Sequence, residues 1–184
     1  KKELFTHRIP NCFLPITEGW KEESDRLTAL QEASQQMLLM QQLPERCLIN
    51  VQMKVQEAQQ AGVILHAEED MKEGYYLYVE PARKRIVYRS WLRMSEDGGK
   101  TFPYDVEMET PVRDTGDGSY HMEIVTEGSI GVVYVNDEAA LSFRMYDFKD
   151  RRLGLFSFGK TVFESVSMSV MERYPENKEE IRCE

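Results

Sequence analysis

The sequence predicts an all-β protein, and three observations support that fold class. Short apolar runs rich in β-branched and aromatic residues follow one another from residue 120 to 171, and turn residues separate them. Residues 47–55 alternate between apolar and polar side chains, as in a strand with one buried face. Two aromatic runs earlier in the chain are joined by a short turn. The C-terminal part is therefore expected to be a β-meander or one half of a sandwich.

The predicted strands after residue 119 are 120–126, 130–135, 141–145, 152–157 and 162–170. The turns between them contain residues that tolerate the left-handed backbone of a tight hairpin. These turns are Glu127-Gly128-Ser129, Asn136-Asp137 and Phe158-Gly159-Lys160. We therefore expect consecutive antiparallel strands joined by hairpins.

The middle of the chain predicts further strands. In residues 47–55 every second side chain is apolar, beginning with Cys47. These alternate side chains are therefore expected to face the core. Residues 61–67 include apolar side chains at both odd and even positions, so both faces of the strand would be apolar. This is typical of a strand buried on both sides. Residues 74–80 and 85–91 predict a hairpin across the intervening Pro-Ala-Arg-Lys turn.

The segment from Trp20 to Leu43 fits two structures. Its leucines and methionines fall near helical spacing behind a possible cap at Ser24, and good helix formers surround them. The alternative is a pair of short strands at 26–30 and 36–40. A family resemblance, described below, favours the strands.

We expect three parts along the chain. Residues 1–19 contain Pro10 and Pro15 and are predicted to be a linker or N-terminal extension. Residues 20–171 form the sandwich domain, and residues 172–184 form a C-terminal tail. A length of 184 residues with 41% hydrophobic residues suits one domain with a sizeable core.

Charge and composition exclude several classes of partner. The 23 basic and 32 acidic residues give a net charge of −9, which repels a phosphate backbone, so nucleic acid and anionic membranes are not expected partners. No apolar run is long enough to cross a bilayer, and the start at Lys1 lacks an apolar signal region. Any export signal would lie upstream of this sequence.

The three cysteines, Cys12, Cys47 and Cys183, are widely spaced, and no pair has metal-ligand spacing. We expect free thiols in preference to a disulfide framework. This favours a reducing, cytoplasmic compartment, although export of the parent protein is left open.

Few residues have the pattern of a metal or catalytic site. Asp114 and Asp117 lie on a glycine-containing turn and are candidate calcium ligands. The spacing of an EF-hand loop is missing, so an acidic surface loop is the favoured interpretation. His7, His66 and His121 stand alone, and a satisfied or exposed histidine is expected at each. We expect no cofactor and no metal.

Two short matches resemble sialidases. Residues 95–102 read Ser-Glu-Asp-Gly-Gly-Lys-Thr-Phe, which is similar to the Asp-box of those enzymes, and Arg8-Ile9-Pro10 resembles their substrate-binding arginine motif. Sialidases repeat the box in each propeller blade, whereas it occurs once here. A sialidase-related fragment is therefore kept only as a third hypothesis.

A longer resemblance covers residues 20–171. The order of apolar runs is similar to the concanavalin A-like modules that accompany glycoside hydrolases. Residues 131–146 and 153–166 resemble the C-terminal module of glycoside hydrolase family 32, the β-fructosidases and invertases. The residues at matching places are Tyr134, Asn136, Arg144, Tyr146 and Gly154. The resemblance implies a two-sheet antiparallel β-sandwich of the concanavalin A-like, jelly-roll type.

The resemblance also implies a function. Catalysis in family 32 resides in a separate N-terminal propeller with motifs Trp-Met-Asn-Asp-Pro-Asn-Gly, Arg-Asp-Pro and Glu-Cys, and none of them occurs in this sequence. Glycosidic cleavage needs two facing carboxylates. The chain is therefore expected to be an accessory module that stabilises or assists a catalytic propeller, with fructoside-type carbohydrate as a possible ligand.

A free-standing carbohydrate-binding module is the alternative hypothesis. An exposed patch of Tyr76, Tyr78, Arg89 and Trp91 would offer ring faces and a guanidinium to a sugar. In the competing interpretation these rings fill the core or pack on a neighbouring domain. A small sandwich glycosidase is a further possibility, for which the candidate carboxylate pairs are Glu107 with Glu109 and Glu123 with Glu164.

Overall fold

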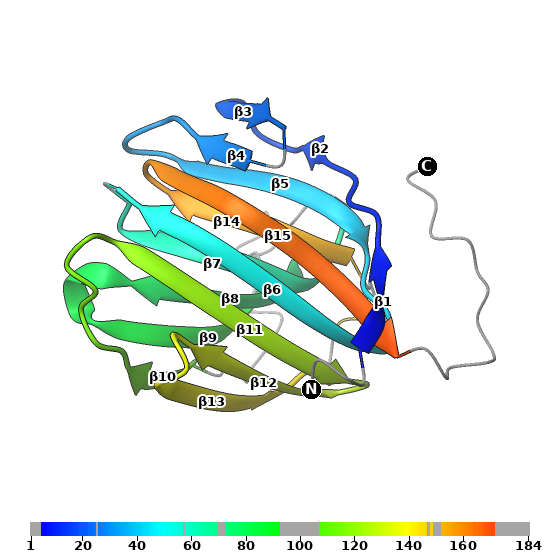
Figure 1. Cartoon of the computed structure of the whole chain (residues 1–184). Coiled ribbons are helices and arrows are strands. Elements are labelled where there is room, and N and C mark those ends of the chain that lie inside the picture. The colour runs from blue at the N-terminus through cyan, green and yellow to red at the C-terminus, as the bar shows by residue number, and fades with distance from the viewer. Residues whose placement is uncertain are drawn as a thin grey trace, which may run out of the picture.

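The protein is a sandwich of two antiparallel sheets packed face to face (Figure 1). The structure is a computed structural model, and it describes residues 5–24, 26–56, 58–69, 73–92, 107–146, 148 and 152–171. Within these ranges the only helical element is the 3₁₀ turn Pro81–Arg83. The predicted all-β, two-sheet antiparallel sandwich is confirmed.

One sheet has eight strands and the other has seven. The hydrogen-bonded order of the eight-stranded sheet is β13 (Ala139–Arg144), β12 (Ile130–Val135), β11 (Ser119–Glu127), β6 (Arg46–Val55), β15 (Thr161–Met171), β4 (Arg26–Ala29) and β3 (Trp20–Glu23), and β1 (Phe5–Ile9) also pairs with β15. The order of the seven-stranded sheet is β10 (Glu107–Pro111), β9 (Arg85–Leu92), β8 (Glu73–Glu80), β7 (Gln60–Ala67), β14 (Arg152–Phe158), β5 (Gln35–Gln42) and β2 (Leu14–Pro15).

The main core lies between the sheets, and β6 shows how the sequence builds it. The five alternate residues from Cys47 to Val55 all belong to this core, as their parity predicts. The residues between them face outward, and Gln52 is exposed. β7 lies inside the other sheet, between β8 and β14, and residues 61–65 are all buried. The prediction of a strand buried on both faces is therefore confirmed.

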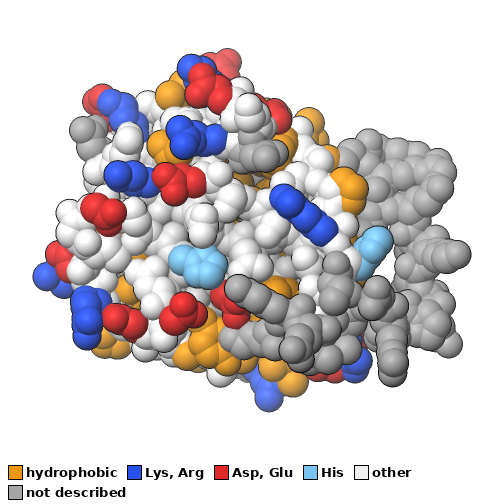
Figure 2. Space-filling model, in the orientation of Figure 1, with side chains coloured by type: hydrophobic (Ala, Val, Ile, Leu, Met, Phe, Trp, Pro, Cys, Tyr) orange, Lys and Arg blue, Asp and Glu red, His pale blue; other side chains and the backbone are white. Residues whose placement is uncertain are grey.

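The outer face of the eight-stranded sheet is polar. Figure 2 shows acidic and basic side chains scattered over this face, with uncharged polar side chains and backbone between them. Asn50, Gln52 and Lys54 of β6 point outward there, beside His121 and Glu123 of β11. Such a face is typical of an antiparallel sheet with one solvated side.

The five predicted C-terminal strands are present, but their connections differ from the prediction at one turn. β11, β12 and β13 form a meander. The turn at Gly159, where φ is +110°, does not close a hairpin, because β14 belongs to the seven-stranded sheet and β15 to the eight-stranded sheet. A left-handed residue permits a sharp turn of either kind, and the apolar faces of the two strands decide which sheet each joins.

The ambiguous segment from Trp20 to Leu43 is extended. Leu27 and Ala29 of β4 are buried, and β4 pairs with β15. Leu38 and Met40 of β5 are buried, and β5 pairs with β14. The helical alternative was wrong, because tertiary pairing outweighs the weak helix propensity of these residues.

The N-terminal residues form strands of the sandwich. β1 pairs with β15 and places Ile9 in the core, where the side chain is 3% exposed. β2 pairs with β5. Residues 5–9 and 14–15 thus contribute edge strands within a segment that the sequence predicted to be a linker.

The cysteines differ from one another. Cys47 is a free, buried thiol, as predicted, and burial raises its pKa to about 12 although the nearby Thr126 hydroxyl lowers it. Cys12 is in a disulfide, so the prediction of free thiols was wrong for this residue. Disulfides are typical of oxidising compartments, and the argument for a reducing compartment therefore does not hold. Cys183 lies outside the described residues.

No helix in the part of the chain that the structure describes is both long and apolar enough to cross a membrane.

Candidate functional site

The predicted sugar-binding patch lies on the outer face of the seven-stranded sheet. Tyr76 is paired with Arg89 across β8 and β9, and Tyr78 lies two residues along the same face. The pairing therefore brings these three side chains together. The two tyrosines are 6% and 5% exposed, so the expectation of exposed rings was wrong. The side chain of Trp91 lies outside the described residues.

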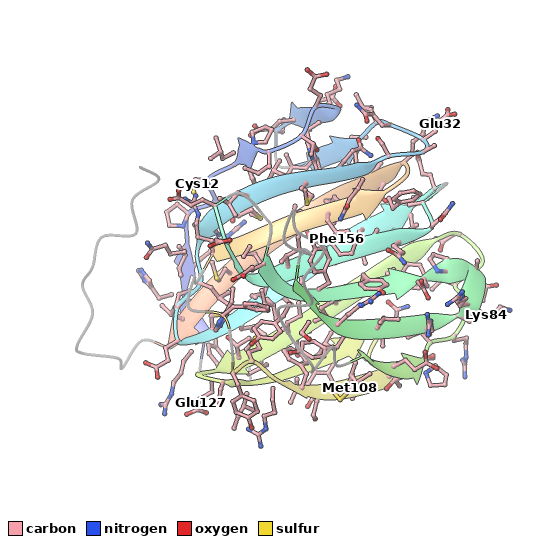
Figure 3. All side chains as sticks on the ribbon, turned by 180° about the vertical axis from the view of Figure 1, so that it is seen from behind. Cys12, Glu32, Lys84, Met108, Glu127 and Phe156 are labelled. Atoms are coloured by element: carbon pink, nitrogen blue, oxygen red, sulfur yellow. The ribbon has the colours of Figure 1, made fainter. Side chains whose placement is uncertain are left out.

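The two tyrosines are buried because this face carries an apolar cluster of its own. The cluster contains Leu39, Ile64, Ala67, Tyr76, Tyr78, Val87 and Phe156. The Phe156 ring, labelled in Figure 3, meets the Tyr76 and Tyr78 rings edge-on, with centroids 4.9 and 5.5 Å apart. The Tyr76 hydroxyl donates to the sulfur of Met37 over 3.8 Å. The rings of Tyr76 and Tyr78 therefore contribute to the packing of this cluster.

A row of polar side chains runs beside this cluster across four strands. The Gln60 amide donates to Glu80 over 2.8 Å, and Arg85 donates to both Glu80 and Glu109. Burial raises the pKa of the Glu80 carboxyl, but the hydrogen bonds from Arg85 and Gln60 outweigh burial and lower it overall. These hydrogen bonds link the four neighbouring strands from β7 to β10.

The carboxylates of the acidic turn before β11 accept hydrogen bonds from backbone amides of the same turn, and Asp114 also forms an ion pair with Lys84 over 3.4 Å. Asp114 accepts a hydrogen bond from the Gly116 amide, and Asp117 accepts one from the Ser119 amide, each over 3.0 Å. These backbone hydrogen bonds are the main cause that lowers the pKa of both carboxyls. Among the described residues no three His, Cys, Asp or Glu side chains come together as metal ligands. The backbone hydrogen bonds of the turn account for the positions of the Asp114 and Asp117 carboxylates.

The candidate carboxylate pairs do not form an acid and base facing each other. Glu109 forms an ion pair with Arg85, and the Glu107 side chain lies outside the described residues. Glu123 and Glu164 belong to β11 and β15, on opposite sides of β6. None of the four lines either of the cavities described next. The described residues therefore do not support a glycosidase site at these carboxylates.

The first cavity opens at the edge where the two sheets meet, and it has a volume of about 420 Å³. Met108 in Figure 3 marks this edge, where the Thr110 hydroxyl of β10 donates to the Ala140 carbonyl of β13. Apolar side chains dominate the walls, and the polar lining residues are Ser90, Ser142 and Arg144. Stacked rings of Tyr88 and Phe143, 4.7 Å apart, contribute to the floor.

A second cavity of about 420 Å³ adjoins the first at Tyr146, which lines both. It lies beside the turn that follows Glu127, the residue labelled at this end of the sandwich in Figure 3. Its polar side chains are Glu45, His66 and Ser129. We call the two cavities together the Tyr146 cleft.

Hydrogen bonds hold the backbone on both sides of Tyr146. The Tyr88 hydroxyl donates to the Arg144 carbonyl, and the Met145 amide donates to the Ser129 carbonyl over 2.8 Å. Beyond Tyr146, the Phe148 amide donates to the Tyr75 hydroxyl over 3.4 Å, and His66 Nδ1 lies 3.2 Å from the Phe148 carbonyl oxygen as its donor.

The family resemblance matched Tyr146 to a position in the family 32 module, but the sequence did not indicate that this residue lines a cleft. Its side chain is 72% exposed, while its neighbours Met145 and Phe148 are 3% and 8% exposed. The cleft is assembled from segments far apart in sequence, so no local spacing could have indicated it. The signal in the sequence was only the aromatic residue just past the end of a predicted strand.

The two sialidase-like matches gain no support as a site. The Asp-box at 95–102 lies outside the described residues. In β1, Arg8 is exposed and Ile9 is part of the main core.

Comparisons with known proteins agree with this architecture. The family model described as "Glycosyl hydrolases family 32 C terminal" matches residues 20–171. No curated protein matches the chain in sequence.

Solved structures resemble the whole sandwich. The carbohydrate-binding module CBM66 from Bacillus subtilis aligns with a TM-score of 0.67 at 15% identity, over 85% of this chain and 94% of that module. The wild-type fructosyltransferase from A. japonicus aligns with a TM-score of 0.59 at 19% identity, over 91% of this chain and 28% of the enzyme.

The exo-inulinase from Aspergillus awamori gives a TM-score of 0.60 at 14% identity, over 91% of this chain and 30% of the enzyme. The chain thus spans under a third of the length of these two enzymes. At such identities the likeness shows the fold. Because the family model covers the whole span from β3 to β15, the chain belongs to the family of C-terminal modules of family 32 glycosyl hydrolases.

Proposed function

We propose that this chain is a non-catalytic accessory module that packs beside the propeller of a family 32-type β-fructosidase and stabilises it. The family match over residues 20–171 carries this proposal. The sequence supports it, because it contains none of the three motifs that the resemblance assigns to catalysis. The arrangement of the described carboxylates is consistent with a supporting role.

A direct test mixes this chain with a family 32 catalytic domain that lacks its own C-terminal module. We expect the mixture to co-elute in size-exclusion chromatography and the melting temperature of the catalytic domain to rise, because binding to the folded state stabilises it. An unrelated β-sandwich of similar size is the control. Equal behaviour of the two mixtures would contradict the proposal. Incubating this chain alone with sucrose, inulin and levan should release no sugar, and turnover would contradict its non-catalytic role.

A second function is carbohydrate binding by the module itself, with fructosides as the ligand class. The Tyr146 cleft favours it, since ligand sites are typically concave and combine apolar walls, as in the first cavity, with a few polar groups, as in the second. The fold shared with a carbohydrate-binding module is consistent with this function. Titration of the isolated module with inulin and levan oligosaccharides, followed by calorimetry, tests it, and a flat titration would contradict it.

A further inference from the structure

We propose that the Tyr146 cleft binds an oligosaccharide of at least two neutral sugar units, with the Tyr146 ring as the stacking surface between them. This inference rests on the carbohydrate-binding part of the proposed function. It assigns that binding to the cleft between the sheet edges and not to the outer face of the seven-stranded sheet.

The backbone presents Tyr146 in a fixed position. Four hydrogen bonds hold the carbonyl of Arg144, the amide of Met145 and both polar groups of Phe148. The side chains of Met145 and Phe148 are anchored in the main core. Because the backbone on both sides is held, only the side-chain torsions of Tyr146 remain to be ordered when a ligand binds, which lowers the entropic cost of binding.

The Tyr146 side chain is 72% exposed. The exposed large hydrophobic residues among those described are Leu14, Leu30, Ile130 and Tyr146. Two of the four, Ile130 and Tyr146, line the same cleft, and Tyr146 is the aromatic one. A sugar presents C–H groups on its ring face, and an exposed phenol ring offers them an apolar surface together with a polar hydroxyl.

The division of the cleft sets the length of the ligand. Each cavity has about 420 Å³, within the range of small-molecule pockets, and Tyr146 lies at the boundary between them. The arrangement therefore suits one sugar unit on each side of the ring, with the linkage passing over Tyr146.

The polar groups of the cleft favour an uncharged polyhydroxylated ligand. The first cavity is lined by the polar side chains of Ser90, Ser142 and Arg144. The second is lined by the Glu45 carboxylate, the Ser129 hydroxyl and the His66 ring, whose Nδ1 donates to the Phe148 carbonyl. Donors and acceptors are thus present on both sides, and the cationic and anionic side chains lie in different cavities. Such a lining matches hydroxyl groups, and the net charge of −9 opposes a polyanion.

The outer face of the seven-stranded sheet is a poorer site. Tyr76 and Tyr78 are nearly buried, and their rings pack edge-on against Phe156. Opening a ring face there would require breaking that packing. The Tyr146 ring is accessible without such a change.

The test uses the whole chain and calorimetric titration with fructose and with fructo-oligosaccharides of two to four units. We expect the oligosaccharides to bind at least about tenfold more tightly than fructose, because a second subsite adds contacts. Tyr146→Ala should weaken oligosaccharide binding by about tenfold or more, the size of effect typical of a key aromatic contact. Tyr146→Phe should keep most of the affinity, since it retains the ring.

Leu30→Ala is the matched control. Leu30 is 48% exposed and does not line the cleft, so its truncation should leave the affinity unchanged. Circular dichroism melting curves of all variants check that each is folded. Glu45→Gln adds a variant in the second cavity, and it should weaken oligosaccharide binding more than fructose binding.

Three results would overturn the inference. Oligosaccharide binding that survives Tyr146→Ala unchanged would move the sugar site elsewhere and leave the proposed function intact. Absence of sugar binding, with the catalytic domain still stabilised, would remove the sugar site and leave the accessory role. Loss of that stabilisation in Tyr146→Ala, without loss of sugar affinity, would make the cleft a domain interface.

Discussion

The ring of Phe143 stacks on the ring of Tyr88, with centroids 4.7 Å apart and an angle of 18° between the planes. This contact joins β13 of one sheet to β9 of the other. Gly131 lies opposite Phe143 on β12, and a Cβ built there would stand 2.2 Å from the Phe143 ring. The stack therefore depends on a residue without a side chain at position 131.

Gly131→Ala should destabilise the fold by about 1–3 kcal/mol, the usual range for an overpacked core site. The effect should be smaller when Phe143 is replaced by Leu, because the clashing ring atoms are gone. Urea unfolding of the two single variants and the double variant measures the coupling between the residues. Strictly additive effects would show that the two residues do not interact as the structure indicates.

Cys47 predicts a pH-dependent loss of stability in alkali. Burial raises the pKa of its thiol to about 12, whereas an unfolded cysteine titrates near 9. The stabilisation is present below pH 9 and is lost as the pH rises towards 12, because only the unfolded state releases the proton in that window. The slope should be about 1.4 kcal/mol per pH unit.

Cys47→Ala should lack this contribution. The measurement is the difference in unfolding free energy between the native protein and this variant from pH 8 to 11, so that the titration of other groups cancels. A difference that is constant with pH would contradict the prediction.

Glu80 links β8 to β9 and β7 through Arg85 and Gln60. Glu80→Gln should lower the unfolding free energy by about 1–3 kcal/mol at pH 7, because the charged hydrogen bonds of a buried carboxylate are lost. Since the folded-state pKa of Glu80 is lowered below 4.5, the stabilisation is present above about pH 4.5 and is lost as the pH falls through the folded value.

The exposed pair of Lys21 with Glu23 provides the control for Glu80. Glu23→Gln should leave the free energy of unfolding nearly unchanged, because solvent-exposed ion pairs contribute little. Denaturant unfolding at pH 7 and pH 3 separates the two variants. Equal effects of the two variants at pH 7 would contradict the assigned role of Glu80.

β1 is expected to be an integral strand of the sandwich. Ile9→Ala should cost about 2–5 kcal/mol, the range for truncating a buried aliphatic side chain. Leu14→Ala, at a residue that is 52% exposed, is the control and should be nearly neutral. Unfolding curves compare the two. A neutral Ile9→Ala variant would instead favour a linker role for residues 1–19.

Tyr78 is expected to contribute to stability. Tyr78→Ala should destabilise the protein by about 3–5 kcal/mol, as for other large buried rings. Tyr134→Ala, a half-buried tyrosine on the outer face of the eight-stranded sheet, should be milder. If Tyr78→Ala left the melting temperature unchanged and abolished sugar binding, the originally predicted patch would be the binding site.

Much of the fold followed from local sequence. The alternation from Cys47 to Val55 identified the inner face of β6, and the Asn136-Asp137 turn, with φ of 51° and 56°, was specified by residue type. The strands at Trp20 to Leu43 were less certain, because periodicity alone also fitted a helix. Their neighbours β14 and β15, more than 100 residues away, settled the structure.

The sequence by itself determined that the chain is an all-β module of a glycoside hydrolase type, because strand alternation, turn chemistry and family motifs are local properties. The tertiary structure alone decided which aromatic rings are accessible. Parity placed Tyr76 and Tyr78 on an outer face, but packing against Phe156 buried them, while Tyr146 became exposed beside residues from both sheets. Exposure depends on segments distant in sequence, and a pattern of neighbours along the chain does not contain that information.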